Sequence, residues 1–234
     1  MALNTITHKN ILVRILKDIF TNASIGPILG FKGGTAVFLF HQLSRFSVDI
    51  DLDLLDLEKT DLVFNTIKQI LSNYGTIKQA DNKRHSLLFI LSYENKTPGD
   101  QNLKVEINLR DFNSKYEILS FLGISMKVMT KEDMFAHKLC AMYERMERAN
   151  RDIFDVHYFL SNNWALNKYI VETRMNMSLK DSLQRCIQSL EKLTNHKILS
   201  GMGELLDDKQ KAWVKSKLVT ETIFLLRLKL EEYQ

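Results

Sequence analysis

The chain has 234 residues, of which 45% are hydrophobic and 26% charged, proportions that indicate a folded globular protein and exclude a disordered one. Its formal net charge of +4 is too small for a polycationic arm, so any contact with nucleic acid must come from a local basic patch. The 2 cysteines provide neither a disulfide framework nor a CxxC metal pair, which favours a reducing compartment. The first apolar stretch, residues 11–20, is interrupted by Arg14, Lys17 and Asp18 and predicts neither a signal peptide nor a membrane span. We therefore expect a cytoplasmic protein without membrane contact.

Strand patterns are concentrated in the first half of the chain, among shorter helical patterns. Pro27 prevents helical structure immediately before the strand expected over 28–32. Thr97-Pro98-Gly99-Asp100 suits the turn of a hairpin between the last two expected strands. In chain order, the expected elements are a helix over 8–22, a strand over 28–32, a Gly33-Gly34 turn followed by a helix that begins near Thr35 and ends near Leu43, a strand over 48–55, a helix over 59–73, and strands over 75–80, 85–93 and 102–110.

Helical patterns fill the second half of the chain. Thr130 and Asp133 resemble a capping box with Asp in place of Glu, at the start of the first of these helices. Further helices are expected over 153–160, 168–175, 179–193 and 209–230. The sequence thus predicts two domains, an α/β domain over residues 1–125 and a helical bundle over residues 126–234.

Carboxylates alternate with apolar residues in the strand predicted over 48–55. Asp49 and Asp51 leave the same face of an extended chain about 7 Å apart, a spacing at which two hard oxygen ligands can share a Mg²⁺ ion. Glu106 lies on the polar face of the strand over 102–110 and is a candidate third ligand, which would allow two ions and phosphoryl-transfer chemistry. A solvated strand face is the alternative explanation for the two aspartates alone.

The Gly33-Gly34 pair lies between a predicted strand and a predicted helix. Backbone N–H groups at such a helix start attract phosphate, and glycine allows the phosphate to approach the backbone closely. Without the nearby aspartates, a simple turn would be the better interpretation. Together the glycine pair and the aspartates favour a nucleotide site, to which Thr35 is a candidate contributor.

Lys138 and Asp152 are two charged residues of the helical half of the chain, 14 positions apart. If both belonged to one straight helix, they would be roughly 21 Å apart along its axis, too far apart to act on one nucleotide. A break near Ala149-Asn150 would let the chain fold back, since Asn tolerates left-handed dihedral angles. The alternative is that both residues are solvated helix charges. The basic residues around them, which could guide phosphates, are Arg145, Arg148 and Arg151.

This order of motifs resembles the nucleotidyltransferase fold of the DNA polymerase beta superfamily, and in particular the AbiEii/AbiGii toxin family. The resemblance covers about residues 28–160. It is carried by Gly33-Gly34-Thr35-Ala36, Arg45, Ser47 and Asp49-Ile50-Asp51-Leu52 in the first motif, and by Lys138-Leu139-Cys140-Ala141, Arg145, Arg151-Asp152 and Asp155 in the later one, with a looser match at Glu106.

The resemblance implies an α+β fold, with a mixed β-sheet flanked by helices and followed by a C-terminal helical bundle. It also implies a Mg²⁺-dependent toxin that transfers a nucleoside monophosphate from a nucleoside triphosphate to RNA, perhaps a tRNA 3′ end, and that has a cognate antitoxin. Asp49, Asp51 and Glu106 would hold metal, and Gly33, Gly34, Thr35, Ser47 and Lys138 would bind the nucleotide. One of Asp152 and Asp155 would join Lys138 in the active site, and we favour Asp152, although the motif separates the two poorly. A small-molecule or protein acceptor, and a non-catalytic module that binds nucleotide or RNA, are the alternatives.

Overall fold

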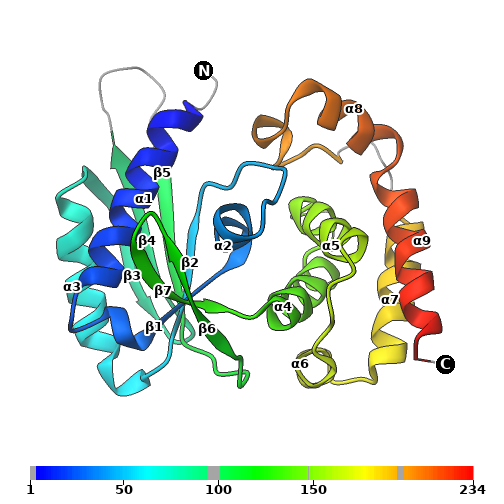
Figure 1. Cartoon of the computed structure of the whole chain (residues 1–234), viewed down its shortest axis with the longest axis horizontal. Helices are drawn as coiled ribbons and strands as arrows, with labels where there is room; N and C mark the ends of the chain where they lie inside the picture. Colours follow the sequence, from blue (N-terminus) through cyan, green and yellow to red (C-terminus); the bar gives the residue numbers. More distant parts are fainter. Residues whose placement is uncertain (1–3, 94–100, 147, 194–197, 234) are drawn as a thin grey trace. The chain divides into compact units, whose positions relative to one another are not determined.

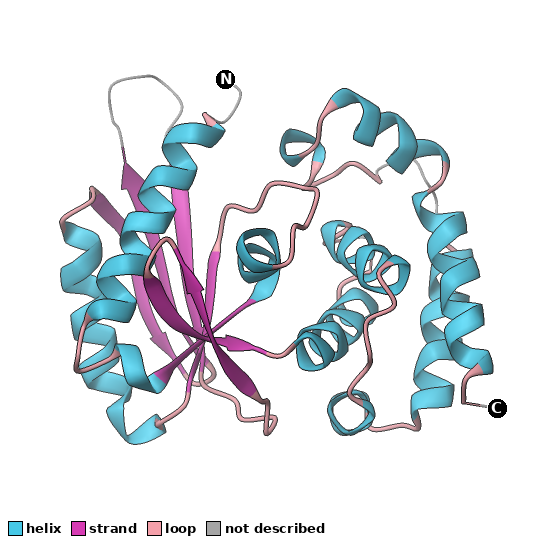
Figure 2. Ribbon diagram, viewed as in Figure 1, coloured by secondary structure: helices cyan, strands magenta, loops and turns pink. Residues whose placement is uncertain are grey.

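The computed structural model of the chain describes residues 4–93, 101–146, 148–193 and 198–233. The chain divides into two compact units, Met1–Asp111 with Tyr116–Met129 and Phe112–Lys115 with Thr130–Gln234. Residue 125, where the sequence placed the domain boundary, lies inside the last strand of the first unit. The first unit combines strands with helices and the second is helical (Figure 2). The predicted α+β fold class, with helices after the sheet, is confirmed.

Within the described residues, the first unit contains one seven-stranded mixed sheet with the order β3-β4-β5-β2-β1-β7-β6 (Figure 1). β2 runs parallel to β5 and β1 parallel to β7, and the other neighbours are antiparallel. Its elements are α1 (Thr5–Thr21), β1 (Leu29–Lys32), α2 (Gly33–Phe40), β2 (Ile50–Leu54), α3 (Thr60–Ser72), β3 (Thr76–Lys83), β4 (Ser86–Tyr93), β5 (Gln101–Asn108), β6 (Tyr116–Phe121) and β7 (Ile124–Met129), with short 3₁₀ turns over Gly26–Ile28 and Leu57–Lys59.

One face of this sheet forms the hydrophobic core of the first unit with α1 and α3. Phe89 of β4 contacts Phe64 of α3 at a ring distance of 5.1 Å, and Phe31 of β1 contacts Phe20 of α1 at 6.2 Å. Residues paired with these two across the central strands, including Val105 and Leu52, are fully buried on the same face. Because side chains alternate along a strand, the intervening polar residues of β1, β2 and β5 all lie on the opposite face.

Several predicted boundaries differ from the structure. The helix expected from Thr35 to Leu43 begins at Gly33 and ends at Phe40, and β2 is shorter than the predicted strand, so that Asp49 precedes it. The strands β6 and β7 were not predicted. β6 is an edge strand with half of its residues exposed, so its side chains show no continuous apolar pattern. The hairpin turn expected over 97–100 lies outside the described residues.

The second unit is a group of packed helices, in which α7 and α9 lie side by side (Figure 1). Its helices are α4 (Lys131–Glu144), α5 (Arg151–Ser161), α6 (Lys168–Met175), α7 (Leu179–Glu191), α8 (Asp208–Ser216) and α9 (Leu218–Glu231), with a 3₁₀ turn over Gly203–Leu205. Phe159 of α5 stacks on Trp164 at a ring distance of 4.3 Å and meets Phe135 of α4 edge-on, which joins the first two helices of this unit.

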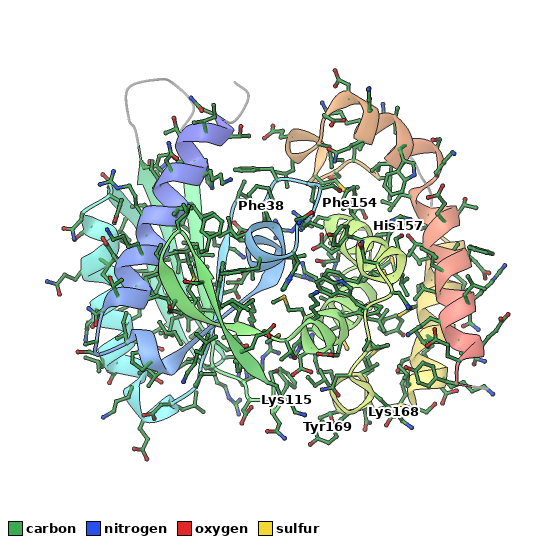
Figure 3. The ribbon with its side chains drawn as sticks, viewed as in Figure 1. Phe38, Lys115, Phe154, His157, Lys168 and Tyr169 are labelled. Atoms are coloured by element: carbon green, nitrogen blue, oxygen red, sulfur yellow. The ribbon has the colours of Figure 1, made fainter. Side chains whose placement is uncertain are left out.

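Two predictions for the second unit were wrong in detail. The helix expected over 209–230 is divided at Lys217, whose φ of −132° is not helical. The division brings Trp213 of α8 against Phe154 and His157 of α5, which are labelled in Figure 3. The expected capping box also fails, since Thr130 makes no side-chain cap. Asp133 instead accepts hydrogen bonds from Lys115 N and Asn167 Nδ2.

Among the residues that the structure describes, no helix has both the length and the apolar character needed to cross a bilayer.

Candidate active site

The predicted metal ligands of the first unit lie together on the polar face of the sheet. Asp51 of β2 and Glu106 of β5 are register partners on adjacent parallel strands, which are about 4.8 Å apart. Asp49 leaves the chain on the same side, one residue before β2 begins. We refer to Asp49, Asp51 and Glu106 as the acidic cluster. Two of its acids therefore come from neighbouring strands, as the sequence predicted, and the third lies next to the start of β2.

The ammonium group of Lys104 lies among the three acids. Its Nζ is 2.9 Å from Glu106 Oε2, 3.8 Å from Asp49 Oδ2 and 3.9 Å from Asp51 Oδ1. Burial by itself would lower the pKa of Lys104, but attraction by Asp51 and Asp49 and the hydrogen bond to Glu106 outweigh it, so the pKa lies above its ordinary value. Lys104 is therefore charged at neutral pH. Three carboxylates around one ammonium leave two formal negative charges in excess.

The chemistry of the acidic cluster fits a hard divalent cation. All three acids provide oxygen ligands, the donors that Mg²⁺ prefers, and they already surround a positive group. As the side chains stand, with Lys104 between them, no three His, Cys or acidic residues in the described part of the chain are arranged to hold an ion. A divalent ion would thus have to draw these oxygens closer together.

Asp53, the third aspartate of the alternating series, has a different environment. Its carboxylate accepts hydrogen bonds from Lys32 Nζ at 2.5 Å, Asn108 Nδ2 at 2.7 Å and the Tyr116 hydroxyl at 2.6 Å. Hydrogen-bond donors from β1, β5 and β6 therefore satisfy the carboxylate of Asp53, a residue that is only 7% exposed. Asp53 joins four strands, and we assign it a structural function.

The glycine pair at the start of α2 lies directly against the acidic cluster. Gly33 has a φ of +79°, which favours glycine, and a Cβ at this position would collide with the Asp51 side chain. A Cβ on Gly34 would lie 2.7 Å from the Arg45 guanidinium and 3.0 Å from Ser47 Oγ. A side chain at either position would therefore have to displace these neighbouring groups, and at Gly33 it would also be strained by the positive φ.

Thr35 and Ser47, predicted nucleotide-binding residues, support the backbone next to Asp49. Both are buried, their hydroxyls hydrogen-bond at 2.9 Å, and Thr35 also donates to the Asp49 carbonyl. The fully buried Arg45 donates to the Phe46 carbonyl at 3.0 Å in the same loop. In the structure these polar side chains therefore position Asp49 relative to α2.

The second unit holds a second charged cluster, formed by Lys138 with Asp152 and Asp155. Lys138 Nζ is 2.9 Å from Asp152 Oδ1 and 2.8 Å from Asp155 Oδ2, and Arg145 lies 2.7 Å from the other Asp152 oxygen. Both aspartate side chains are 0% exposed, and that of Lys138 is 15% exposed. The alternative in which Lys138 and Asp152 are solvated helix charges is therefore wrong. Both candidate aspartates bind the same ammonium group.

The chain break that brings these residues together lies where it was predicted. α4 ends at Glu144 and α5 begins at Arg151, so Lys138 and Asp152 are on separate helices. The proposed cause was wrong, because Asn150 has a right-handed φ of −59°. After α4 the Arg145 carbonyl accepts hydrogen bonds from the backbone N–H groups of Arg148 and Ala149.

Neither cysteine has the properties of a nucleophile. Burial raises the pKa of Cys140 to about 11, and it also raises that of Cys186, so both thiols stay protonated near neutral pH.

Sequence reasoning missed the environment of three residues in the first unit, on or near the polar face of the sheet. The alternating pattern placed Lys104 on the polar face of its strand but did not connect it with the three acids. The match of Arg45 to the first family motif gave no sign that the Arg45 side chain is completely buried. The contact of Tyr116 with Asp53 could not be found without β6. Only the i, i+2 spacing of Lys104 and Glu106 was available as a signal.

Comparison with known proteins identifies one family. A profile described as "Nucleotidyl transferase AbiEii toxin, Type IV TA system" matches residues 14–213, a longer part of the chain than the motifs alone cover. The comparison with curated protein sequences gives no match.

Solved structures show the same fold. JHP933 from Helicobacter pylori is 21% identical, with a TM-score of 0.64 over 100% of this chain and 96% of that one. MenT4, a nucleotidyltransferase toxin from Mycobacterium tuberculosis, is 16% identical, with a TM-score of 0.59 over 94% of this chain and 83% of that one.

Proposed function

The chain belongs to the AbiEii family of nucleotidyltransferase toxins, of type IV toxin–antitoxin systems, and we propose that it transfers a nucleoside monophosphate to an RNA hydroxyl in a Mg²⁺-dependent reaction. The observation that carries this proposal is the direct pairing of Asp51 with Glu106 across β2 and β5, beside the Gly33 turn. A strand pair of this kind provides carboxylates for a divalent ion and an adjacent backbone that a phosphate can approach.

In the proposed reaction, the residues of the acidic cluster act at the α-phosphate. Asp49 and Asp51 would hold the ion, which when bound supplies positive charge to the phosphate oxygens. Glu106 has the most exposed side chain of the three, at 40%, and would also accept the proton of the attacking hydroxyl. The new bond joins the acceptor oxygen to the α-phosphorus, and the bond to the departing pyrophosphate breaks.

The Gly33-Gly34 backbone would bind the triphosphate, with Thr35 and Ser47 fixing the loop that carries Asp49. We assign Lys138 to the triphosphate as well, since two buried aspartates hold its ammonium group in a fixed position. Asp152 and Asp155 would then both position Lys138. These assignments follow the family motifs residue by residue.

RNA is the proposed acceptor, with the 3′ end of tRNA as the specific candidate. The family resemblance supports this proposal, and so does the basic segment of the second unit, in which Arg148 is exposed and Arg145, although paired with Asp152, is 48% exposed. A cognate antitoxin is the expected protein partner, because the family is one of toxin–antitoxin systems.

The decisive experiment incubates the purified protein with Mg²⁺, total RNA and each of the four labelled nucleoside triphosphates in turn. Label is expected in one RNA size class, with one triphosphate preferred, and sequencing of the labelled 3′ ends would identify the acceptor. Label in protein or in a small molecule would overturn the RNA assignment. Absence of transfer from every triphosphate would favour the non-catalytic binding module.

A further inference from the structure

Lys104 is a half-buried basic side chain that the proposed reaction does not use. It leaves the same face of β5 as Glu106, two residues earlier, and its side chain is 28% exposed. Its ammonium donates a hydrogen bond to Glu106 and lies within 4 Å of both Asp49 and Asp51. Lys104 thus contacts every acid of the cluster.

Without this lysine, three carboxylates would face one another on a half-buried surface. Like charges at such distances repel strongly because little water separates them. The ammonium offsets part of this repulsion, so it stabilises the cluster when no other cation is present. The cluster keeps two negative charges in excess and can still attract a divalent ion.

A divalent ion and the Lys104 ammonium are drawn to the same oxygen atoms. Mg²⁺ requires oxygens about 2.0–2.1 Å away, whereas those around Nζ lie between 2.9 and 3.9 Å from it. The two positive groups would also repel each other at close range. The ion and the ammonium therefore compete for one position.

We propose that Lys104 is an internal placeholder cation, which occupies the centre of the acidic cluster in the metal-free protein and is displaced when a divalent ion binds. The inference rests on the proposed function in one respect, that the acidic cluster binds a divalent ion. Its consequence is that Lys104 lowers the affinity for the ion and raises the stability of the metal-free fold. The lysine thereby sets the ion concentration at which the site fills.

The test measures Mn²⁺ binding without nucleotide, by the loss of the free-ion signal in electron paramagnetic resonance. Mn²⁺ prefers the same oxygen ligands as Mg²⁺ and is directly visible. Lys104→Met and Lys104→Gln, which remove the charge, are expected to bind Mn²⁺ at least about tenfold more tightly than the unaltered protein, a change of about 1.4 kcal/mol. Lys104→Arg keeps the charge and is the matched control, with affinity close to that of the unaltered protein.

Thermal melting provides the second measurement. Without metal, both neutral variants are expected to melt at a lower temperature than the unaltered protein. Saturating Mn²⁺ should raise their melting temperatures by more than it raises that of the unaltered protein, because a ligand that binds only the native state stabilises it by mass action. Lys104→Gln can still hydrogen-bond Glu106, so it allows the test even if Lys104→Met does not fold.

The outcomes separate the inference from the function on which it rests. Equal Mn²⁺ affinity in the unaltered protein and both neutral variants, with binding lost in Asp51→Asn, would overturn the placeholder and leave the metal site in place. Equal affinity in all of these proteins, Asp51→Asn included, would overturn the metal site and with it both proposals. Tighter binding in the two neutral variants alone would support the placeholder.

Discussion

The acidic cluster of the first unit and the Lys138 cluster of the second differ in burial and in charge balance. Three partly exposed acids surround one ammonium in the first, whereas two fully buried acids are matched by Lys138 and Arg145 in the second. An unbalanced cluster that water can reach is suited to take up a cation. A balanced and buried cluster is suited to hold one side chain in a fixed position, and its loss should affect folding as well as function.

The largest expected effect is the loss of nucleotide transfer in Asp51→Asn. The substitution removes a proposed ion ligand, but it also relieves repulsion among the acids, so the metal-free protein should melt no lower than before. Transfer of labelled nucleotide and thermal melting would be measured on the same preparation. Undiminished transfer would remove Asp51 from the mechanism.

Asp53→Asn is the matched control on the same face of the same strand. Asp53 accepts hydrogen bonds from three protein donors, so the substitution should destabilise the fold by about 1–3 kcal/mol, the cost of leaving buried partners unsatisfied. Transfer below the melting temperature should be retained. If Asp51→Asn and Asp53→Asn change transfer and melting temperature in the same way, the distinction between an ion-binding aspartate and a structural one does not hold.

The second unit should respond to Lys138→Met with a loss of about 3–5 kcal/mol in unfolding free energy, since two buried carboxylates would be left with Arg145 alone. Tryptophan fluorescence during urea unfolding reports this selectively, because both tryptophans of the chain, Trp164 and Trp213, belong to the second unit. Lys168→Met, which changes an exposed lysine of α6, is the control and should leave the midpoint unchanged. A midpoint equally unchanged in Lys138→Met would show that the buried acids do not depend on Lys138.

Lys138→Ala should also lower transfer by at least about a hundredfold, the low end for losing one well-placed electrostatic contact. Activity has to be measured at a temperature at which fluorescence shows the variant to be folded. Loss of both stability and transfer would distinguish Lys138 from Asp51, whose substitution affects transfer alone. Near-normal turnover would make the Lys138 cluster purely structural and would bring the binding-module alternative forward.

The smallest expected effect is a pH dependence of the second unit through His157. Burial lowers the pKa of His157 despite attraction by Glu221, so the folded state disfavours the protonated form. Stability should therefore be unaffected above pH 6.5, the unfolded value, and should fall as the pH drops below it, by at most about 1.4 kcal/mol per pH unit.

Urea unfolding at several pH values between 5 and 8, followed by tryptophan fluorescence, measures this slope. His157→Gln should lose the added slope below pH 6.5, and His85→Gln, which alters an exposed histidine, should keep it. If the unfolding free energy of His157→Gln fell with pH as steeply as that of the unaltered protein, the acid sensitivity would belong to other groups.

Local pattern was sufficient to predict most elements and the first half of the candidate site. Strict alternation placed Asp51 and Glu106 on the polar faces of two strands, and helical spacing gave α6 its observed bounds, Lys168–Met175. The order of motifs identified the family, which the match over residues 14–213 confirms. These features depend on neighbours in sequence, which is why the sequence alone determined them.

Pairing between distant segments was decided only by the tertiary structure. Which strand lies beside β2 depends on hydrogen bonds to β5, some 50 residues later, and these place the Lys104 ammonium among the acids. In the second unit, the reversal between α4 and α5 lets one ammonium reach both Asp152 and Asp155, between which the motif alone did not choose. Charges interact through space and not along the chain, so the balance of each cluster exists only once the strands and helices have packed.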